Sequence, residues 1–172
     1  MVTSTTTKPD AKSDAMTQPT AQEENVQEEA QTQERRRGGD RRAAGSKTRV
    51  VIVDGHTLFR RGVRQILELE NDIEVVGEAG SGREALATVE ELTPDVVLMD
   101  LGLPDIDGVG ATRMLAEHEW TAAIPVVAMS ASSLEGREDW LKQNGFAGSI
   151  DKPIRVGAFP EQVRRYCADG TT

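Results

Sequence analysis

Residues 50–59 have the sequence VVIVDGHTLF, and this stretch decides the fold. Four apolar β-branched residues, Val50 to Val53, lead into Asp54, and a glycine and the beginning of a helical pattern follow. A strand that is apolar at every position has no polar face to expose to water, so it belongs in a sheet that is covered on both faces. The stretch therefore predicts a central strand of a parallel sheet, with Asp54 at its carboxyl end.

The rest of the chain alternates between strand-like and helix-like segments. The predicted strands are VVIVD (50–54), IEVVGEA (73–79), DVVLMD (95–100), IPVVAMS (124–130) and GFAGSID (145–151). Apolar residues between them recur at helical spacing, as at Phe59, Val63 and Leu67. The segments 108–118 and 133–144 are weaker helices because they contain glycine. Five strands alternating with five helices predict an α/β fold, a doubly wound and mainly parallel sheet.

Composition divides the chain into two parts. Residues 1–47 are mostly polar, with no aromatic residue, so we predict a disordered charged tail. The formal net charge of −9 lies in residues 49–172, which should repel nucleic acid, and no nucleic acid partner is expected. Within the tail, residues 35–47 are basic. They either bind an acidic partner or a membrane surface, or form a solvated linker that contacts its own acidic domain.

Three absences in the sequence predict a cytoplasmic protein. The single cysteine, Cys167, cannot form an internal disulfide, which favours a reducing compartment. The N-terminus lacks the apolar core of a signal peptide, and no apolar run approaches the roughly 18 residues of a membrane span. We therefore expect no membrane span.

Polar side chains follow the predicted strands where these end. Asp54 ends the first strand, Asp100 the third and Ser130 the fourth, and Lys152 follows the fifth. Parallel sheets bind ligands outside the carboxyl ends of their strands, so these four residues should share one edge. Two neighbouring carboxylates repel each other unless a cation lies between them, and oxygen ligands suit Mg²⁺. An ammonium and a hydroxyl can hold phosphoryl oxygens, so the edge predicts phosphoryl transfer onto an aspartate.

Each residue also has a plainer interpretation when it is taken alone. Ser130 can cap the fourth helix, and Lys152 can be a solvated surface residue. Asp105 and Asp107 are expected in a turn and a helix cap and not at the metal. His56 is interpreted as a capping or surface residue without ligand partners nearby.

Two enzyme classes are excluded by their motifs, and no enzyme activity is predicted. GEAGSGRE (77–84) nearly matches a P-loop, but it has Arg83 and Glu84 where Lys and Ser or Thr are required. No G-x-S-x-G nucleophile elbow of a hydrolase occurs.

Four segments together resemble the receiver domain of bacterial two-component response regulators over residues 49–168. They are VVIVDGHTLFRRG (50–62), PDVVLMDLGLPDIDG (94–108), VVAMSAS (126–132) and GSIDKPI (148–154). The resemblance implies a flavodoxin-like fold with the strand order 2-1-3-4-5. It also implies partners, namely a histidine kinase or phosphotransfer protein and a downstream protein.

The resemblance assigns a role to each matching position. Asp100 matches the aspartate that accepts the phosphoryl group, and the Gly102 carbonyl would bind Mg²⁺ together with Asp100 and Asp54. Ser130 matches the hydroxyl residue that turns towards the phosphoryl group, and Lys152 the lysine that pairs with it. The bond from Lys152 to the next residue, a proline, is expected to be cis.

The sequence departs from the family pattern at two positions. Receivers usually carry two adjacent acidic residues after the first strand, but Gly55 follows Asp54 here, so one metal ligand is missing and Mg²⁺ binding should be weak. The family commonly has an aromatic residue three positions before the lysine, and this chain has Ser149. Any activation signal is therefore expected to travel by another route.

These observations leave two hypotheses for function. Asp100, Ser130 and Lys152 favour a stand-alone receiver that takes a phosphoryl group and signals by protein–protein contact. Gly55 and Ser149 favour the alternative, a degenerate receiver that acts as a phosphorylation-independent adaptor. A third possibility is that the tail binds the partner and the domain tunes it.

The resemblance also suggests which surfaces meet partners. Because five residues follow Cys167, we expect no output domain after the receiver. The expected output face includes Trp140, Ser149 and Tyr166. The region of Leu58 and Phe59 is expected to meet the kinase.

Overall fold

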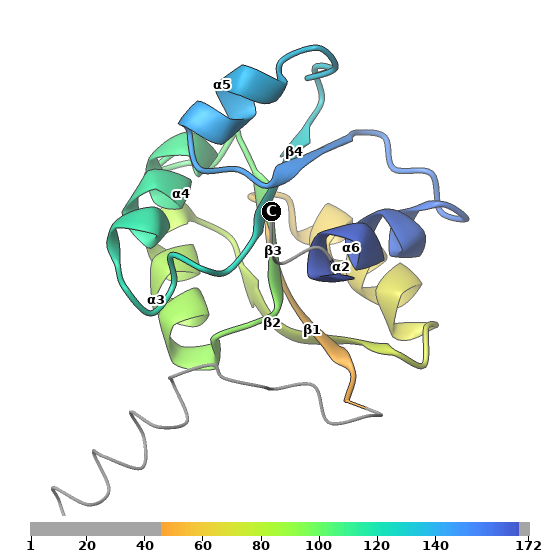
Figure 1. Ribbon diagram of the computed structural model, residues 1–172. Coiled ribbons are helices and arrows are strands. Elements are labelled where there is room, and N and C mark those ends of the chain that lie inside the picture. The colour runs from red at the N-terminus through yellow and green to blue at the C-terminus, as the bar shows by residue number, and fades with distance from the viewer. Residues whose placement is uncertain (1–45, 169–172) are drawn as a thin grey trace, which may run out of the picture. The chain divides into compact units, whose positions relative to one another are not determined.

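The computed structural model describes residues 46–168, in which strands and helices alternate along the chain (Figure 1). The elements are β1 (Thr48–Val53), α2 (Thr57–Glu68), β2 (Ile73–Ala79), α3 (Gly82–Leu92), β3 (Val96–Asp100), α4 (Gly108–Glu117), β4 (Val126–Ser130), α5 (Glu138–Gln143), β5 (Gly148–Asp151) and α6 (Phe159–Ala168). The predicted disordered tail, residues 1–47, lies outside the described residues except for its last two.

All five strands form one parallel sheet in the order β2-β1-β3-β4-β5. The predicted fold class and strand order are therefore confirmed. The chain reverses its direction of travel through the sheet between β1 and β3, which is where ligands bind in sheets of this type. Asp54 and Asp100 follow and end these two neighbouring strands.

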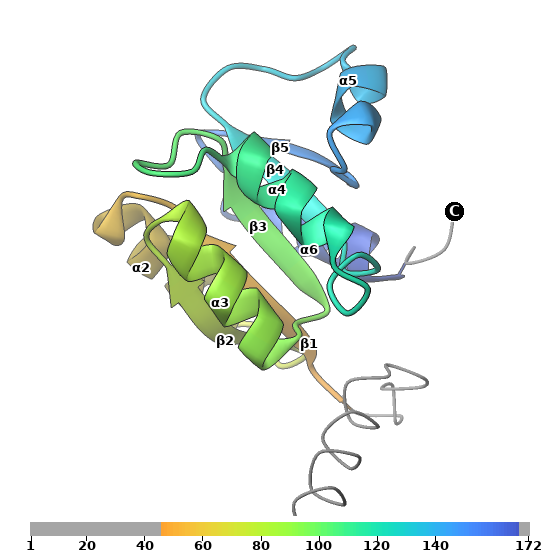
Figure 2. The ribbon, with the colours of Figure 1, turned by 90° about the vertical axis from the view of Figure 1, so that its left-hand side faces the viewer.

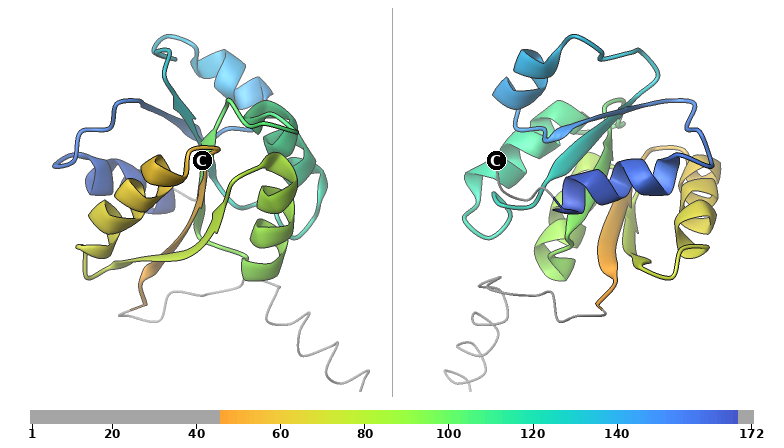
Figure 3. Two further views of the ribbon diagram at one scale, coloured as in Figure 1. Left: turned by 180° about the vertical axis from the view of Figure 1, so that it is seen from behind. Right: turned by 45° about the vertical axis from the view of Figure 1, so that its right-hand side comes forward.

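Helices cover both faces of the sheet (Figures 2 and 3). Alternate residues of a strand point to opposite faces, and β1 shows this directly. Val51 and Val53 pack in the cluster that includes residues of α3, α4 and α5, whereas Val50 and Ile52 pack in the cluster under α2 and α6. Among the described residues, no helix is long and apolar enough to cross a membrane.

Most predicted strands and helices differ from the structure by one or two residues at an end, and three boundaries near the site were wrong. β1 ends at Val53, so Asp54 stands just outside the strand. The fifth strand begins at Gly148 and not at residue 145, because the Phe146 N–H is bonded to the Leu141 carbonyl in the turn that ends α5. The helix predicted from residue 133 begins only at Glu138, since Gly136 has a φ of +76°.

Candidate functional site

Lys152 joins the two buried aspartates at the carboxyl edge of the sheet. Its Nζ donates a hydrogen bond to Asp54 Oδ2 at 2.5 Å and another to Asp100 Oδ1 at 2.8 Å. The Asp54 side chain is fully buried, and that of Asp100 is 10 % exposed. Like charges this close repel each other, and the ammonium between them offsets that repulsion. Three of the four predicted edge residues therefore meet as one ionic cluster.

The backbone after β1 holds Asp54 in place. Asp54 Oδ1 accepts a hydrogen bond from the His56 N–H at 2.7 Å, which turns the chain sharply from the strand into α2. The Asp54 N–H still donates to the Ala79 carbonyl of β2. The side chain and the backbone of Asp54 are thus both held by hydrogen bonds before any ligand binds.

An arginine pair ties α2 to the same turn. Arg60 donates to the Asp54 carbonyl and also bonds to Glu78 on β2, and Arg64 bonds to Glu78 as well. Partial burial alone would raise the pKa of Glu78, but the hydrogen bonds and charges of Arg64 and then Arg60 outweigh it and lower that pKa. This network anchors the helix that leaves the site.

Lys152 reaches the aspartates because β5 and the ring of Phe59 position it. The Lys152 N–H donates to the Ser130 carbonyl at 2.8 Å, and the bond to Pro153 is cis, as predicted. The Lys152 Nζ also lies 4.4 Å from the centre of the Phe59 ring, a distance at which an ammonium is attracted to the ring face. Phe59 was predicted to lie on the apolar side of a helix and near the kinase-binding surface, and its contact with Lys152 was not predicted.

Ser130 lies beside the cluster, but its hydroxyl belongs to a local turn. Ser130 is 8 % exposed, and its Oγ accepts a hydrogen bond from the Ser132 N–H at 3.1 Å. The alternative that Ser130 caps the fourth helix was wrong, because α5 begins eight residues later with Arg137 at its N-cap. A role in holding a phosphoryl group stays a prediction, as does metal binding by the Gly102 carbonyl.

Asp107 caps α4, as predicted, and Asp105 bonds to the first residues of another helix, α3. Asp107 Oδ1 accepts from the Gly110 N–H at the start of α4. Asp105 accepts from the N–H groups of Gly82 and Arg83 at the start of α3. Desolvation would raise the pKa of Asp105, but backbone hydrogen bonds outweigh it and lower that pKa to about 2. These carboxylates stabilise the loops around the site and are not part of the ionic cluster.

His56 is the site residue that sequence reasoning missed. It was predicted to have no ligand partner nearby, and this was wrong: one ligand atom each of Asp54, His56 and Asp100 lie within 4.8 Å of one another. Its Nδ1 is 3.2 Å from Asp54 Oδ1. His56 occupies the N-cap position of α2, but its side chain makes no capping hydrogen bond. The available signal was a histidine two residues after the strand-end aspartate.

The residues present fit a divalent cation. Two carboxylates at one sheet edge supply oxygen ligands of the kind that Mg²⁺ prefers. Gly55 contributes no side-chain ligand, and a Cβ placed there would have ordinary contacts, 3.8 Å from Pro104 Cδ and 3.9 Å from the Gly80 carbonyl oxygen. The backbone at position 55 therefore has room for a Cβ, although no side-chain ligand is present.

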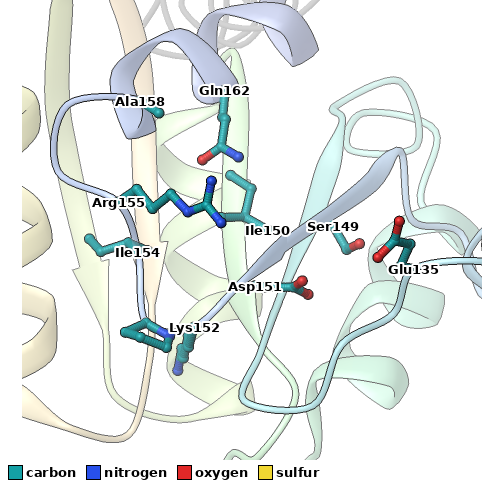
Figure 4. A pocket seen from close by; sticks show the side chains of 10 residues that line it. Glu135, Ser149, Ile150, Asp151, Lys152, Ile154, Arg155, Ala158 and Gln162 are labelled. Carbon is teal, nitrogen blue, oxygen red and sulfur yellow. The ribbon is translucent and has the colours of Figure 1, made fainter.

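A pocket lies beside the carboxylates, between the loop before α5, β5 and α6. Ser149, Arg155 and Gln162 are among its lining residues, and Lys152 is shared with the ionic cluster. Figure 4 shows the Lys152 side chain pointing away from Asp151 and Gln162. Lys152 thus belongs to both the pocket and the ionic cluster. Its ammonium points to Asp54 and Asp100 and not into the pocket.

An aromatic ring does lie near Ser149, but it comes from another element. Tyr166 of α6 packs against Gly148, and its hydroxyl donates to the Ser149 carbonyl at 3.3 Å. A Cβ on Gly148 would overlap the Tyr166 ring, so a larger residue at this position would displace that ring. A ring from α6 therefore contacts β5, which has no aromatic residue of its own.

The topology and the site together define a class. The protein has a flavodoxin-like α/β fold with an aspartate–lysine cluster at the carboxyl edge of a 2-1-3-4-5 sheet. The sequence profile of the response regulator receiver domain matches residues 50–164, and the chain belongs to this family. It is a receiver domain of two-component signalling. Receiver domains are mostly non-enzymatic, bind Mg²⁺ at an acidic pocket and interact with histidine kinases or phosphotransfer proteins.

Individual relatives agree with this assignment. The chain is 35 % identical over 125 residues to the transcriptional regulatory protein DegU of Brevibacillus brevis, covering 73 % of this chain but 52 % of that protein. It is 35 % identical over 120 residues to the polar-differentiation response regulator DivK of Brucella ovis, covering 70 % of this chain and 96 % of that one. The solved receiver domain of NarL from Mycobacterium tuberculosis is 31 % identical, with a TM-score of 0.66 and coverage of 72 % and 98 %. The chain thus spans about half of DegU and nearly all of DivK.

Proposed function

We propose that the protein is a stand-alone receiver that accepts a phosphoryl group on Asp100 and signals by contact with another protein. The observation that carries this proposal is the pair of hydrogen bonds from Lys152 to Asp100 and Asp54. An ammonium held beside the acceptor carboxylate is placed to bind the oxygens of an incoming phosphoryl group. The proposal assigns residues 49–168 to the receiver and leaves the charged residues 1–47 outside it.

The proposed reaction moves one phosphoryl group between two side chains. A carboxylate oxygen of Asp100 attacks the phosphorus of a phosphohistidine on a kinase or phosphotransfer protein. The new O–P bond forms as the P–N bond breaks, and the released imidazole takes up a proton. Asp54, Asp100 and the Gly102 carbonyl would hold Mg²⁺, which offsets the charge of the phosphoryl oxygens when it is bound.

The location and the output of the protein are also proposals. We place it in the cytoplasm, because the single cysteine, Cys167, favours a reducing compartment. The similarity to almost the whole length of DivK supports a stand-alone receiver. The acidic charge of residues 49–172 supports a protein as the downstream partner and disfavours nucleic acid.

Mass spectrometry of the intact chain tests the acceptor. The chain is incubated with acetyl phosphate and Mg²⁺, and Asp100→Asn is compared with Asp139→Asn, which changes an exposed aspartate on α5. We expect one phosphoryl adduct on the wild type and on Asp139→Asn, and none on Asp100→Asn. An adduct that persists in Asp100→Asn would exclude Asp100 as the acceptor.

A second candidate function is a phosphorylation-independent adaptor. It is favoured by Gly55 and by the Lys152 ammonium, which offsets part of the carboxylate charge through hydrogen bonds to both aspartates. This candidate predicts no adduct on the wild type. An adduct on Gly55→Asp alone would show that the fold is intact and that the missing ligand disables phosphorylation.

A further inference from the structure

We propose that His56 supplies an imidazole ligand beside Asp54 and Asp100, so that this site prefers a first-row transition metal ion such as Co²⁺ over Mg²⁺. The inference deepens the proposed function, because it specifies the metal class of the same site, and it rests on that site binding a cation. It does not require Asp100 to be phosphorylated.

The positions of the three side chains carry the geometric part of the argument. Their ligand atoms lie within 4.8 Å of one another. Ligands bound about 2.1 Å from one ion lie at most about 4.2 Å apart, so only a small movement is required. The side chain of His56 is 82 % exposed and can make that movement, whereas Asp54 is fully buried and fixed. The His56 Nδ1 already lies 3.2 Å from Asp54 Oδ1, so the imidazole faces the carboxylates.

The chemistry of the donor atoms carries the second part. Mg²⁺ demands oxygen ligands in near-octahedral geometry, and Gly55 removes one side-chain oxygen from the site. An imidazole nitrogen suits Co²⁺, Ni²⁺ and Zn²⁺, whose affinities for mixed nitrogen and oxygen ligands exceed those of the hard ions. A site that lacks the carboxylate at position 55 and gains the imidazole of His56 therefore binds Mg²⁺ less tightly and favours a softer ion.

Lys152 explains why the additional ligand matters. Its ammonium bonds to both carboxylates, so any metal ion at Asp54 and Asp100 competes with it. Mg²⁺ would compete through the two carboxylates and backbone oxygen. A transition metal ion gains the imidazole as well, and this added bond shifts the competition towards the metal.

Cobalt binding to the full chain provides the test. Isothermal titration gives the affinities for Co²⁺ and Mg²⁺, and the visible absorption of Co²⁺ reports nitrogen ligation. His56→Ala is compared with His118→Ala, which removes the chain's other histidine. Because His56 is exposed and makes no side-chain cap, its removal should not unfold the domain. Thermal unfolding of each variant checks this.

We expect the wild type to bind Co²⁺ at least about tenfold more tightly than Mg²⁺. Even residues that only hydrogen-bond to metal ligands commonly change metal affinity by about that factor, so a direct imidazole ligand should do at least as much. His56→Ala should lower Co²⁺ affinity at least about tenfold, change the absorption spectrum and leave Mg²⁺ affinity within about twofold. His118→Ala should change none of these quantities. Equal Co²⁺ affinity and an unchanged spectrum in His56→Ala would overturn the inference.

The two proposals fail in different measurements. If Co²⁺ binds through His56 but no metal supports an adduct on Asp100, the proposed function fails and the inference stands. If Mg²⁺ supports the adduct and His56→Ala leaves Co²⁺ binding unchanged, the inference fails and the proposed function stands.

Discussion

Replacing Lys152 by methionine removes the ammonium between the two aspartates and keeps most of the aliphatic stem. The side chain of Lys152 is 16 % exposed, and those of Asp54 and Asp100 are 0 % and 10 % exposed. The variant leaves two neighbouring carboxylates buried without their shared cation. Removing one partner of a buried ion pair costs about 3 to 5 kcal/mol, and the partial exposure of Asp100 favours the lower value of about 3 kcal/mol.

Urea unfolding followed by tryptophan fluorescence measures this loss. With a slope of about 2 kcal/mol per molar urea, a loss of about 3 kcal/mol lowers the midpoint by about 1.5 M without changing the slope. Lys142→Met, which alters an exposed lysine of α5, is the matched control and should move the midpoint little.

A double variant separates the charge effect from lost packing. Asp100→Asn removes one of the two repelling carboxylates, so it should recover part of the stability that Lys152→Met loses. Residues in one ionic network usually show a coupling of about 0.5 to 3 kcal/mol. If Lys152→Met is as stable as the wild type, or if the double variant shows no coupling, the ammonium does not neutralise this pair.

Three further changes test other parts of the site. Asp105 has a pKa lowered from 3.8 to about 2, so its contribution to stability is present above about pH 4 and is lost as the pH falls through about 2. In urea unfolding, Asp105→Asn should therefore have a lower free energy of unfolding than the wild type at pH 7. The difference in this free energy should vanish as the pH falls towards 2. A Cβ on Gly108 would overlap the Asp100 carbonyl oxygen, so Gly108→Ala should lower the melting temperature and any phosphoryl adduct. Phe59→Leu should lose about 1 kcal/mol of unfolding free energy, and less in the Lys152→Met background.

Most of the fold was predictable because buried strands have a simple signature. Residues 73–79 were predicted as a strand and form β2 with the same bounds. The start of β5 was not predictable from composition, because Phe146 is apolar in either a strand or a helix-ending turn. Its hydrogen bond to the Leu141 carbonyl depends on where α5 ends, which is a property of the packed domain.

The site was predictable to the extent that strand ends determine it. Asp54, Asp100 and Lys152 were placed at one edge because parallel strands bring their carboxyl ends together. His56 was not placed there, because its ring position follows from a turn in which Asp54 accepts the His56 N–H. The contact between Lys152 and Phe59 was missed for the same reason, since it joins two elements that are distant in the sequence.

Gly55 changes the charge balance of the site, and this change links metal affinity to stability. Asp54, Asp100 and Lys152 together carry one net negative charge, and an acidic residue at position 55 would add a second. The added carboxylate would repel its neighbours when no cation is bound and would hold Mg²⁺ when one is. A Cβ at position 55 has only ordinary contacts, so we expect the effects of Gly55→Asp to come from charge and not from a backbone clash.

The two effects of Gly55→Asp should therefore appear together. Urea unfolding without divalent ions should show a less stable variant, and added Mg²⁺ should restore more stability to it than to the wild type, since a ligand that binds only the folded state stabilises that state. If Mg²⁺ affinity rises while metal-free stability stays unchanged, repulsion among the carboxylates is already fully screened by Lys152. In that case the glycine at position 55 weakens metal binding without any gain in the stability of the metal-free domain.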